Sequence, residues 1–141
     1  MFSKILVPVD GSDISYKALN AALFLSEKLG SNITAIHIME NVPITHIESQ
    51  KLLNQLLESY KKESQDILSK CSEIAIQKGI TINTILLQGN PATAILDFSE
   101  KEKHDIVIMG SHGMGKFKEL ILGSVSSKIL HHSSCPVMLI K

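Results

Sequence analysis

Short β-rich segments alternate with helix-forming segments along the whole chain, and this alternation limits the possible folds more than any other feature. Apolar residues recur at helical spacing after the first short apolar run, at Ala18, Ala22, Leu25 and Leu29. Parallel strands need a crossover between them, which a helix supplies, and such crossovers are right-handed. The pattern predicts an α/β fold with a parallel sheet and helices on both faces.

Turn and capping signals set the segment boundaries. Asp10-Gly11-Ser12 ends the first strand, Gly30 follows the first helix, and Gly89-Asn90-Pro91 precedes a later helix. The predicted strands are Lys4–Val9, Asn32–Met39, Thr81–Gln88, Asp105–Met109 and Pro136–Lys141. The predicted helices are Asp13–Leu29, Ile47–Lys78, Pro91–Lys103, a short one near Phe117–Leu122, and one from Gly123 through His131. We expect one doubly wound domain over residues 1–141 with a five-stranded parallel sheet in the order 3-2-1-4-5.

The long helical segment Ile47–Lys78 allows two interpretations. Its stripe has the three-four spacing shared by coiled coils and by helices that cover a sheet. The stripe consists of Leu53, Leu57, Tyr60, Ser64, Ile67, Cys71 and Ile74. Because Ser64 would weaken a coiled-coil seam, packing against the sheet is the preferred interpretation.

Composition argues against several functions. The 14 basic and 14 acidic residues give zero net charge, so no basic field attracts a nucleic acid. Every basic residue is Lys, so a phosphate would be bound by backbone N–H groups, hydroxyls or Lys. The apolar runs are too short for a bilayer, and the N-terminus lacks signal-peptide features. Cys71 and Cys135 have no metal or redox spacing. We expect a cytoplasmic protein that binds neither nucleic acid nor membrane.

The stretch "MGSHGMGKF" looks at first like a P-loop. Gly110 and Gly115-Lys116 have the P-loop spacing, but Phe117 stands where a Ser or Thr must bind Mg²⁺. The dinucleotide pattern G-x-G-x-x-G fails as well, because Lys118 takes the place of its third glycine. Neither of these two phosphate loops is present.

A wider window contains a coherent arrangement. Gly110-Ser111-His112-Gly113 is followed, after nine residues, by Gly123-Ser124-Val125-Ser126. Glycines at a strand end let the backbone approach a ligand, and a helix start with Ser124 as its N-cap would bind an anion. If the first strand lies beside the fourth, Asp10 faces this loop across the crevice where ligands of doubly wound sheets bind. The sequence therefore predicts one nucleotide-sized pocket.

These residues resemble the universal stress protein family, specifically its ATP-binding branch. The branch's pattern G-x₂-G-x₉-G-(S/T) is matched by Gly110, Gly113, Gly123 and Ser124. The resemblance covers the whole chain, from "KILVPVDGS" through "DIVIMGSHG" and "LILGSVS" to "CPVMLIK". It implies a doubly wound fold, an ATP cofactor with Mg²⁺, no separate protein metal site, and a homodimer formed through the last strand, whose apolar edge invites pairing.

The resemblance also implies a role for each site residue. Pro8, Val9 and Asp10 would contact adenine and ribose, and Ile38 would contact the base. Met109, Gly110, His112 and Gly113 would lie along the ribose and phosphates, and Gly123, Ser124, Val125 and Ser126 would hold the phosphates. The implied function is a nucleotide-dependent regulatory or stress-response module with an unknown protein partner and no catalytic residue.

Other interpretations remain open. The protein could be a slow ATPase or another adenine-nucleotide hydrolase, or a partner-binding stress protein without nucleotide. The ligand could be ATP, ADP, AMP or cyclic AMP. Asp10 could cap the first helix, and Gly110 and Gly113 could merely end a strand. His112 and Lys116 fit surface or ligand-contact roles, His131 and His132 fit a helix end, and Cys71 reads as a small core residue.

Overall fold

A computed structural model describes residues 1–42, 48–113 and 122–141 of the chain. Its strands are β1 (Lys4–Pro8), β2 (Asn32–Met39), β3 (Asn83–Gln88), β4 (Ile106–Gly110) and β5 (Val137–Ile140). Its helices are α1 (Asp13–Leu29), α2 (Gln50–Gln77), α3 (Pro91–Lys101) and α4 (Ser124–His132). The expected short helix near Phe117–Leu122 lies, apart from Leu122, outside the described residues.

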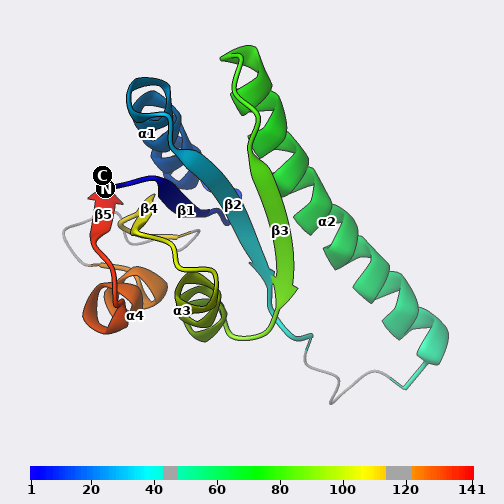
Figure 1. The fold of residues 1–141 in the computed structure, drawn as a ribbon. Coiled ribbons are helices and arrows are strands. Elements are labelled where there is room, and N and C mark those ends of the chain that lie inside the picture. Colours follow the sequence, from blue (N-terminus) through cyan, green and yellow to red (C-terminus); the bar gives the residue numbers. More distant parts are fainter. Residues whose placement is uncertain (43–47, 114–121) are drawn as a thin grey trace.

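All strand pairs are parallel, in the order β3-β2-β1-β4-β5, which confirms the predicted doubly wound sheet (Figure 1). Ile5 of β1 pairs with Ile33 of β2 and with Ile106 of β4, so β1 and β4 are neighbours although about a hundred residues separate them. This pairing brings the loops that follow β1 and β4 to the same edge of the sheet.

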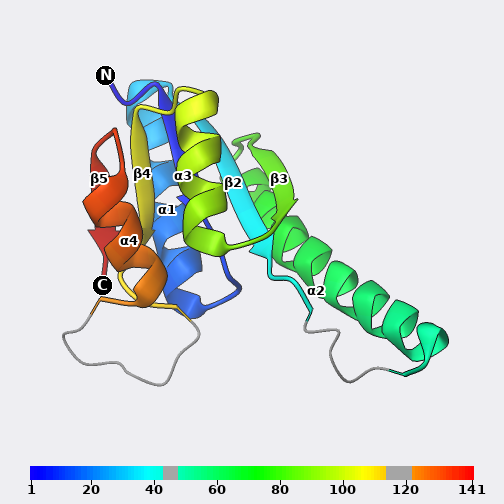
Figure 2. The same ribbon diagram turned by 90° about the horizontal axis from the view of Figure 1, so that it is seen from below.

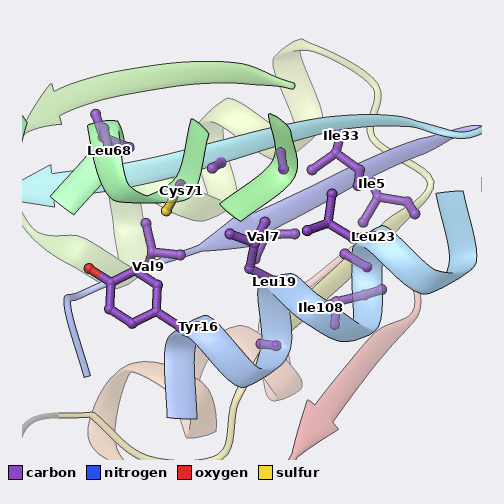
Figure 3. Packing of buried hydrophobic residues seen from close by; sticks show 14 of the residues in the cluster. Ile5, Val7, Val9, Tyr16, Leu19, Leu23, Ile33, Leu68, Cys71 and Ile108 are labelled. Carbon is purple, nitrogen blue, oxygen red and sulfur yellow. The ribbon is translucent and has the colours of Figure 1, made fainter. Parts of the chain in front are cut away.

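The two faces of the sheet have separate apolar cores. α1 and α2 cover one face, where alternate strand residues such as Ile5, Val7 and Ile33 pack against Leu19 and Leu23 of α1 (Figure 3). α3 and α4 cover the other face with Ile95 and Ile129, which pack on Leu6, Ile36 and Val107. Burial on both faces explains why β4 is solidly apolar.

The helix termini follow local capping chemistry. The side chain of Ser12 accepts a hydrogen bond from the N–H of Ser15, and Asn90 does the same for Thr93 before α3. Gly30 ends α1 in the left-handed conformation, at φ 70°. Asp10 is therefore not the α1 cap, because Ser12 occupies that position.

Only the second half of α2 packs against the sheet. Its buried residues are Ser64, Leu68, Cys71 and Ala75, whereas Leu52 and Tyr60 in the first half are exposed. Figures 1 and 2 show the helix extending past the end of the sheet. The sheet-packing interpretation is correct for the second half; in the first half of the predicted stripe, Leu53 and Leu57 are half-buried and Tyr60 is exposed. No helix in the described part of the chain has the length and hydropathy needed to cross a bilayer.

Candidate functional site

The loop after β1 is fixed by β2. The N–H of Val9 donates to the carbonyl of Ile36 at 2.9 Å, and Nδ1 of His37 lies 2.7 Å from the carbonyl oxygen of Val9. The side chain of Val9 is buried in the α1/α2 core. The N–H and the carbonyl of Val9 thus both have partners on β2. Val9 therefore fixes the loop that carries the next residue, Asp10.

Asp10 stands half-buried at the mouth of the crevice. Its Oδ1 accepts hydrogen bonds from the N–H of Ser12, at 3.0 Å, and from the Ser12 hydroxyl. Gly11 between them has φ 87°, and a β-carbon there would lie 3.1 Å from Cδ1 of Ile67 in α2. Ser12 therefore holds one carboxylate oxygen of Asp10, and the other, Oδ2, faces the glycine loop.

The glycines after β4 are required by close approach. A β-carbon on Gly113 would lie 2.8 Å from Oδ2 of Asp10, a distance that real side chains essentially never show. A β-carbon on Gly110 would lie 2.9 Å from Cγ2 of Ile14 in α1. Gly110 is therefore needed for packing of the fold, whereas Gly113 is needed for the approach of the loop to the Asp10 carboxylate.

The start of α4 lies against the same loop. The N–H of Gly123 donates to the carbonyl of Ser111 at 2.9 Å, and a β-carbon on Gly123 would lie 3.2 Å from Cα of His112. Gly123 occupies the N-cap position and no side chain caps the helix. The expectation that Ser124 is the N-cap is wrong, because Ser124 is already the first helical residue and is exposed. The first-turn N–H groups of α4 are left without a side-chain acceptor.

The hydroxyl of Ser126 already has protein partners. It lies 2.7 Å from the carbonyl oxygen of Ser111, to which it donates, and 3.1 Å from that of Gly123. Ser126 is 2% exposed. Its side chain ties α4 to the glycine loop, which leaves the exposed Ser124 as the hydroxyl at this helix start that faces outward.

The apolar residues expected at the site belong to the α3/α4 core. Ile38 and Met109 are 8% and 6% exposed, and Val125 packs against the same cluster. Beside them is a small hollow of about 90 Å³ between the end of β2 and the starts of α3 and α4. It is lined by Glu40, Asn90, Pro91, Ala92, Ser124, Val125 and Lys128.

Sequence reasoning omitted the α3 side of this hollow. Asn90, Pro91 and Ala92 open α3 at the same edge of the sheet as Ser124 and Val125. The sequence predicts Gly89-Asn90-Pro91 as the end of a strand and the start of a helix, without a place in the site. A helix that starts directly after a parallel strand begins at the carboxyl edge of the sheet. The order of strand and helix was therefore enough to predict that these residues lie at this edge.

The remaining polar residues show no catalytic arrangement within the described ranges. Nδ1 of His112 lies 3.4 Å from Oγ of Ser111, and His131 contacts the carbonyl of Ser127 on its own helix. No three His, Cys, Asp or Glu side chains of the described residues come together as metal ligands. Lys116 lies outside these ranges. The described residues at this edge therefore bring a carboxylate, glycine backbone and a helix start close together.

A doubly wound sheet that brings a carboxylate, a glycine loop and an uncapped helix start to one edge defines a class of α/β proteins. The sequence matches the profile of the Universal stress protein family over residues 1–141, and the chain belongs to this family. It is 33% identical to Universal stress protein YxiE of Bacillus subtilis, with all of both chains covered. It is 31% identical to Universal stress protein MJ0531 of Methanocaldococcus jannaschii, covering 100% of this chain and 83% of that one.

Solved structures have the same fold. Universal stress protein UspA from Lactobacillus plantarum superposes with a TM-score of 0.87 at 22% identity, covering 99% of this chain and 98% of the other. A universal stress protein in complex with cAMP gives 0.74 at 22% identity, covering 99% and 97%. A family protein from Arabidopsis thaliana with AMP bound gives 0.70 at 21% identity, covering 99% and 91%.

Proposed function

We propose that this universal stress protein binds ATP, with Mg²⁺, in the crevice between the β1 loop and the glycine loop. The approach of Gly113 to Oδ2 of Asp10, beside the uncapped start of α4, carries the proposal. A carboxylate at this position suits a ribose hydroxyl or a metal ion bound to phosphates. The free N–H groups of a helix start favour a phosphate, and this chain has no Arg to bind one.

The ligand class rests on the family and on the fold. Two of the superposed structures were determined with cAMP and with AMP. Their TM-scores of 0.74 and 0.70 establish the shared fold, and at 22% and 21% identity the adenine nucleotide is carried to this chain as a proposal. The G-x₂-G-x₉-G-S pattern of Gly110, Gly113, Gly123 and Ser124 favours a triphosphate among the adenine nucleotides.

Some residues of the proposed site would contact the nucleotide, and others would hold those residues in place. Asp10 would bind the ribose or the metal, and Pro8, Ile38 and Met109 would contact the base and ribose from the strand ends. His112 and the backbones of Gly113, Gly123, Ser124 and Val125 would surround the phosphates. Ser126 would contribute its N–H, because its hydroxyl is engaged by Ser111. Val9 and Gly110 are assigned to positioning, given their burial.

Mg²⁺ fits this donor set as an ion bound mainly by phosphate oxygens. Asp10 offers one carboxylate, and the described residues contain no cluster of three metal-ligating side chains. Mg²⁺ commonly binds with one carboxylate, several waters and substrate phosphates. The metal would neutralise phosphate charge that Arg would otherwise balance.

The proposed output is regulation through bound nucleotide. Bound phosphates would connect the glycine loop to α4 and Asp10, and so alter a surface read by a protein partner or a second subunit. The exposed edge of β5, with Met138 36% exposed, would form the homodimer. Hydrolysis should be slow, because the described residues show no catalytic arrangement at the crevice and the chain has no Arg to serve as a finger.

The test begins with the purified protein and no added ligand. The protein is denatured, and any released nucleotide is identified by chromatography and mass spectrometry. ATP at about one equivalent supports the proposal. If no nucleotide is released, Mg-ATP is titrated calorimetrically into the wild type, Asp10→Ala, and the exposed-site control Asp13→Ala. Equal affinity of the three proteins, or no heat of binding, would refute an Asp10 site and favour the partner-binding alternative.

A further inference from the structure

A second hollow lies at the opposite, amino-terminal edge of the sheet. It has a volume of about 210 Å³ and is lined by Lys4, Thr34, Asn83, Ile85, Phe98, Glu102 and His104. The C-terminal end of α3 lies beside the starts of the strands at this edge (Figure 2). The volume is below the roughly 300 Å³ at which pockets for drug-sized ligands begin. A ligand here is much smaller than a nucleotide.

The face of the sheet beneath α3 turns polar at this edge. Along β1, β2 and β3, Leu6, Ile36 and Ile85 belong to the apolar core of this face. Two residues earlier on each strand, the same face carries Lys4, Thr34 and Asn83, and Thr34 pairs in register with Asn83. Lys4 lies two residues before Leu6, which is the partner of Thr34 on β1, and all three polar residues line the hollow next to Phe98. The hollow thus offers hydrogen bonds and an apolar surface together.

His104 contributes a buried polar group without a protein partner. The residue is 7% exposed, and its Nδ1 has no hydrogen-bond partner among the described residues. Its ring packs 5.6 Å from that of Phe98. Burial, followed by the positive charge of Lys4, lowers the pKa of His104, so the imidazole is neutral near pH 7. An unsatisfied buried group in a native structure calls for a partner such as water or a ligand.

Two opposite charges line the hollow without neutralising each other. The ammonium of Lys4 donates to the main-chain carbonyl of Glu102, and the Glu102 carboxylate forms no ion pair with it. The ion pair found among the described residues joins Lys28 and Glu27, two neighbours on α1. The ammonium of Lys4 therefore lies beside the main chain of Glu102, and the hollow offers a positive and a negative side chain from adjacent positions, next to an apolar surface formed by Phe98 and Ile85.

We propose that this hollow binds a free α-amino acid with a short apolar side chain. Lys4 receives the carboxylate of the ligand, and Glu102 receives its ammonium group. Phe98 and Ile85 contact the apolar side chain, and Asn83, Thr34 and His104 supply the remaining hydrogen bonds. The site is at the opposite edge of the sheet from Asp10 and Gly113, so it is independent of the proposed nucleotide site.

The experiment uses L-leucine and its two half-molecules as probes. Saturation-transfer NMR on the full chain compares L-leucine with 4-methylpentanoate, which lacks the ammonium, and with isopentylamine, which lacks the carboxylate. Leucine is expected to bind at least about tenfold more tightly than either, since each lost charged hydrogen bond is worth about a factor of ten or more. Saturating Mg-ATP should leave the leucine signal unchanged.

Matched variants locate the binding. Glu102→Gln and Lys4→Met should each weaken leucine binding about tenfold or more. The neighbouring α3 variants Glu100→Gln and Lys101→Met, which do not line the hollow, should bind as the wild type does. Circular dichroism melting confirms that each variant is folded. Absence of a leucine signal at roughly 10 mM, where a millimolar site is largely occupied, would overturn the proposal. Half-molecules that bind as well as leucine would also overturn it, as would equal effects of Glu102→Gln and Glu100→Gln on leucine binding.

Discussion

A β-carbon on Gly113 would lie 2.8 Å from Oδ2 of Asp10, although about a hundred residues separate the two in sequence. The backbone at Gly113 is not in the left-handed region, so the glycine is required by space alone. Asp10 cannot easily move aside, because Ser12 holds its other oxygen through the main-chain N–H and the hydroxyl. One contact therefore joins the two loops of the proposed site.

Gly113→Ala is expected to destabilise the wild type by about 1–3 kcal/mol, the usual range for an overpacked position. In an Asp10→Ala background the same substitution should cost close to nothing, because the atom it meets is gone. Urea unfolding of the four proteins of this double-mutant cycle measures the coupling. Equal costs of Gly113→Ala in both backgrounds would show that the two loops do not touch.

The cost of a substitution at Gly110 should depend on Ile14 of α1 and not on Asp10. A β-carbon there would lie 2.9 Å from Cγ2 and 3.2 Å from Cγ1 of Ile14. Gly110→Ala is expected to cost about 1–3 kcal/mol of unfolding free energy, and Ile14→Ala about 2–5 kcal/mol. The double variant should lose clearly less unfolding free energy than the two single variants lose together, since the new methyl group enters the space that Ile14 leaves. Strict additivity in thermal or urea unfolding would contradict this packing.

The two serines that open α4 should differ in their effect on stability. Ser126→Ala removes the hydroxyl that donates to Ser111, and leaves a buried carbonyl with one partner fewer. We expect a loss of about 1–3 kcal/mol. Ser124→Ala is the matched control and should change stability little, because Ser124 is exposed and is not the N-cap. Differential scanning calorimetry compares the two, and a larger loss for Ser124→Ala would restore Ser124 as the cap.

Cys71 should make stability fall in alkaline solution. Burial raises the pKa of the Cys71 thiol from 9.0 to about 11, against the opposing charge of Lys70. Because the folded-state pKa is raised, the stability that the buried neutral thiol contributes is complete below pH 9 and is lost as the pH rises towards 11, by roughly 3 kcal/mol in total.

The measurement is urea unfolding of the wild type and of Cys71→Ala at about pH 8 and about pH 10.5. These two values span most of the pH range over which the loss occurs. Tyr16 also has a raised pKa, chiefly through burial and then through the charge of Cys71, so the difference between the two proteins reports the thiol together with its effect on Tyr16. The wild type should lose more stability than Cys71→Ala between the two pH values. Equal losses would mean that Cys71 ionises as readily in the fold as in the unfolded chain.

Local chemistry explains what could be predicted. Apolar periodicity and turn residues identified all five strands, and helices α1, α3 and α4, within a few residues, because these signals act between neighbours in the chain. The alternation of strands and helices also placed Asp10 and Gly113 at one edge of a parallel sheet. The start of α2 was expected at Ile47 and is at Gln50, after the Ser49 cap.

Tertiary structure decided the role of each residue within that frame. Whether the Ser126 hydroxyl is free or engaged by Ser111 depends on how the start of α4 lies against the loop after β4, and only the folded chain decides this. The grouping of Lys4, Thr34 and Asn83 around one hollow likewise could not be predicted, because it depends on how three strands lie side by side in the sheet. By itself the sequence determined the order and type of the elements and the edge at which the glycines gather. Strand register and close packing decided which atoms meet there, since those contacts are made by residues that only the folded sheet brings together.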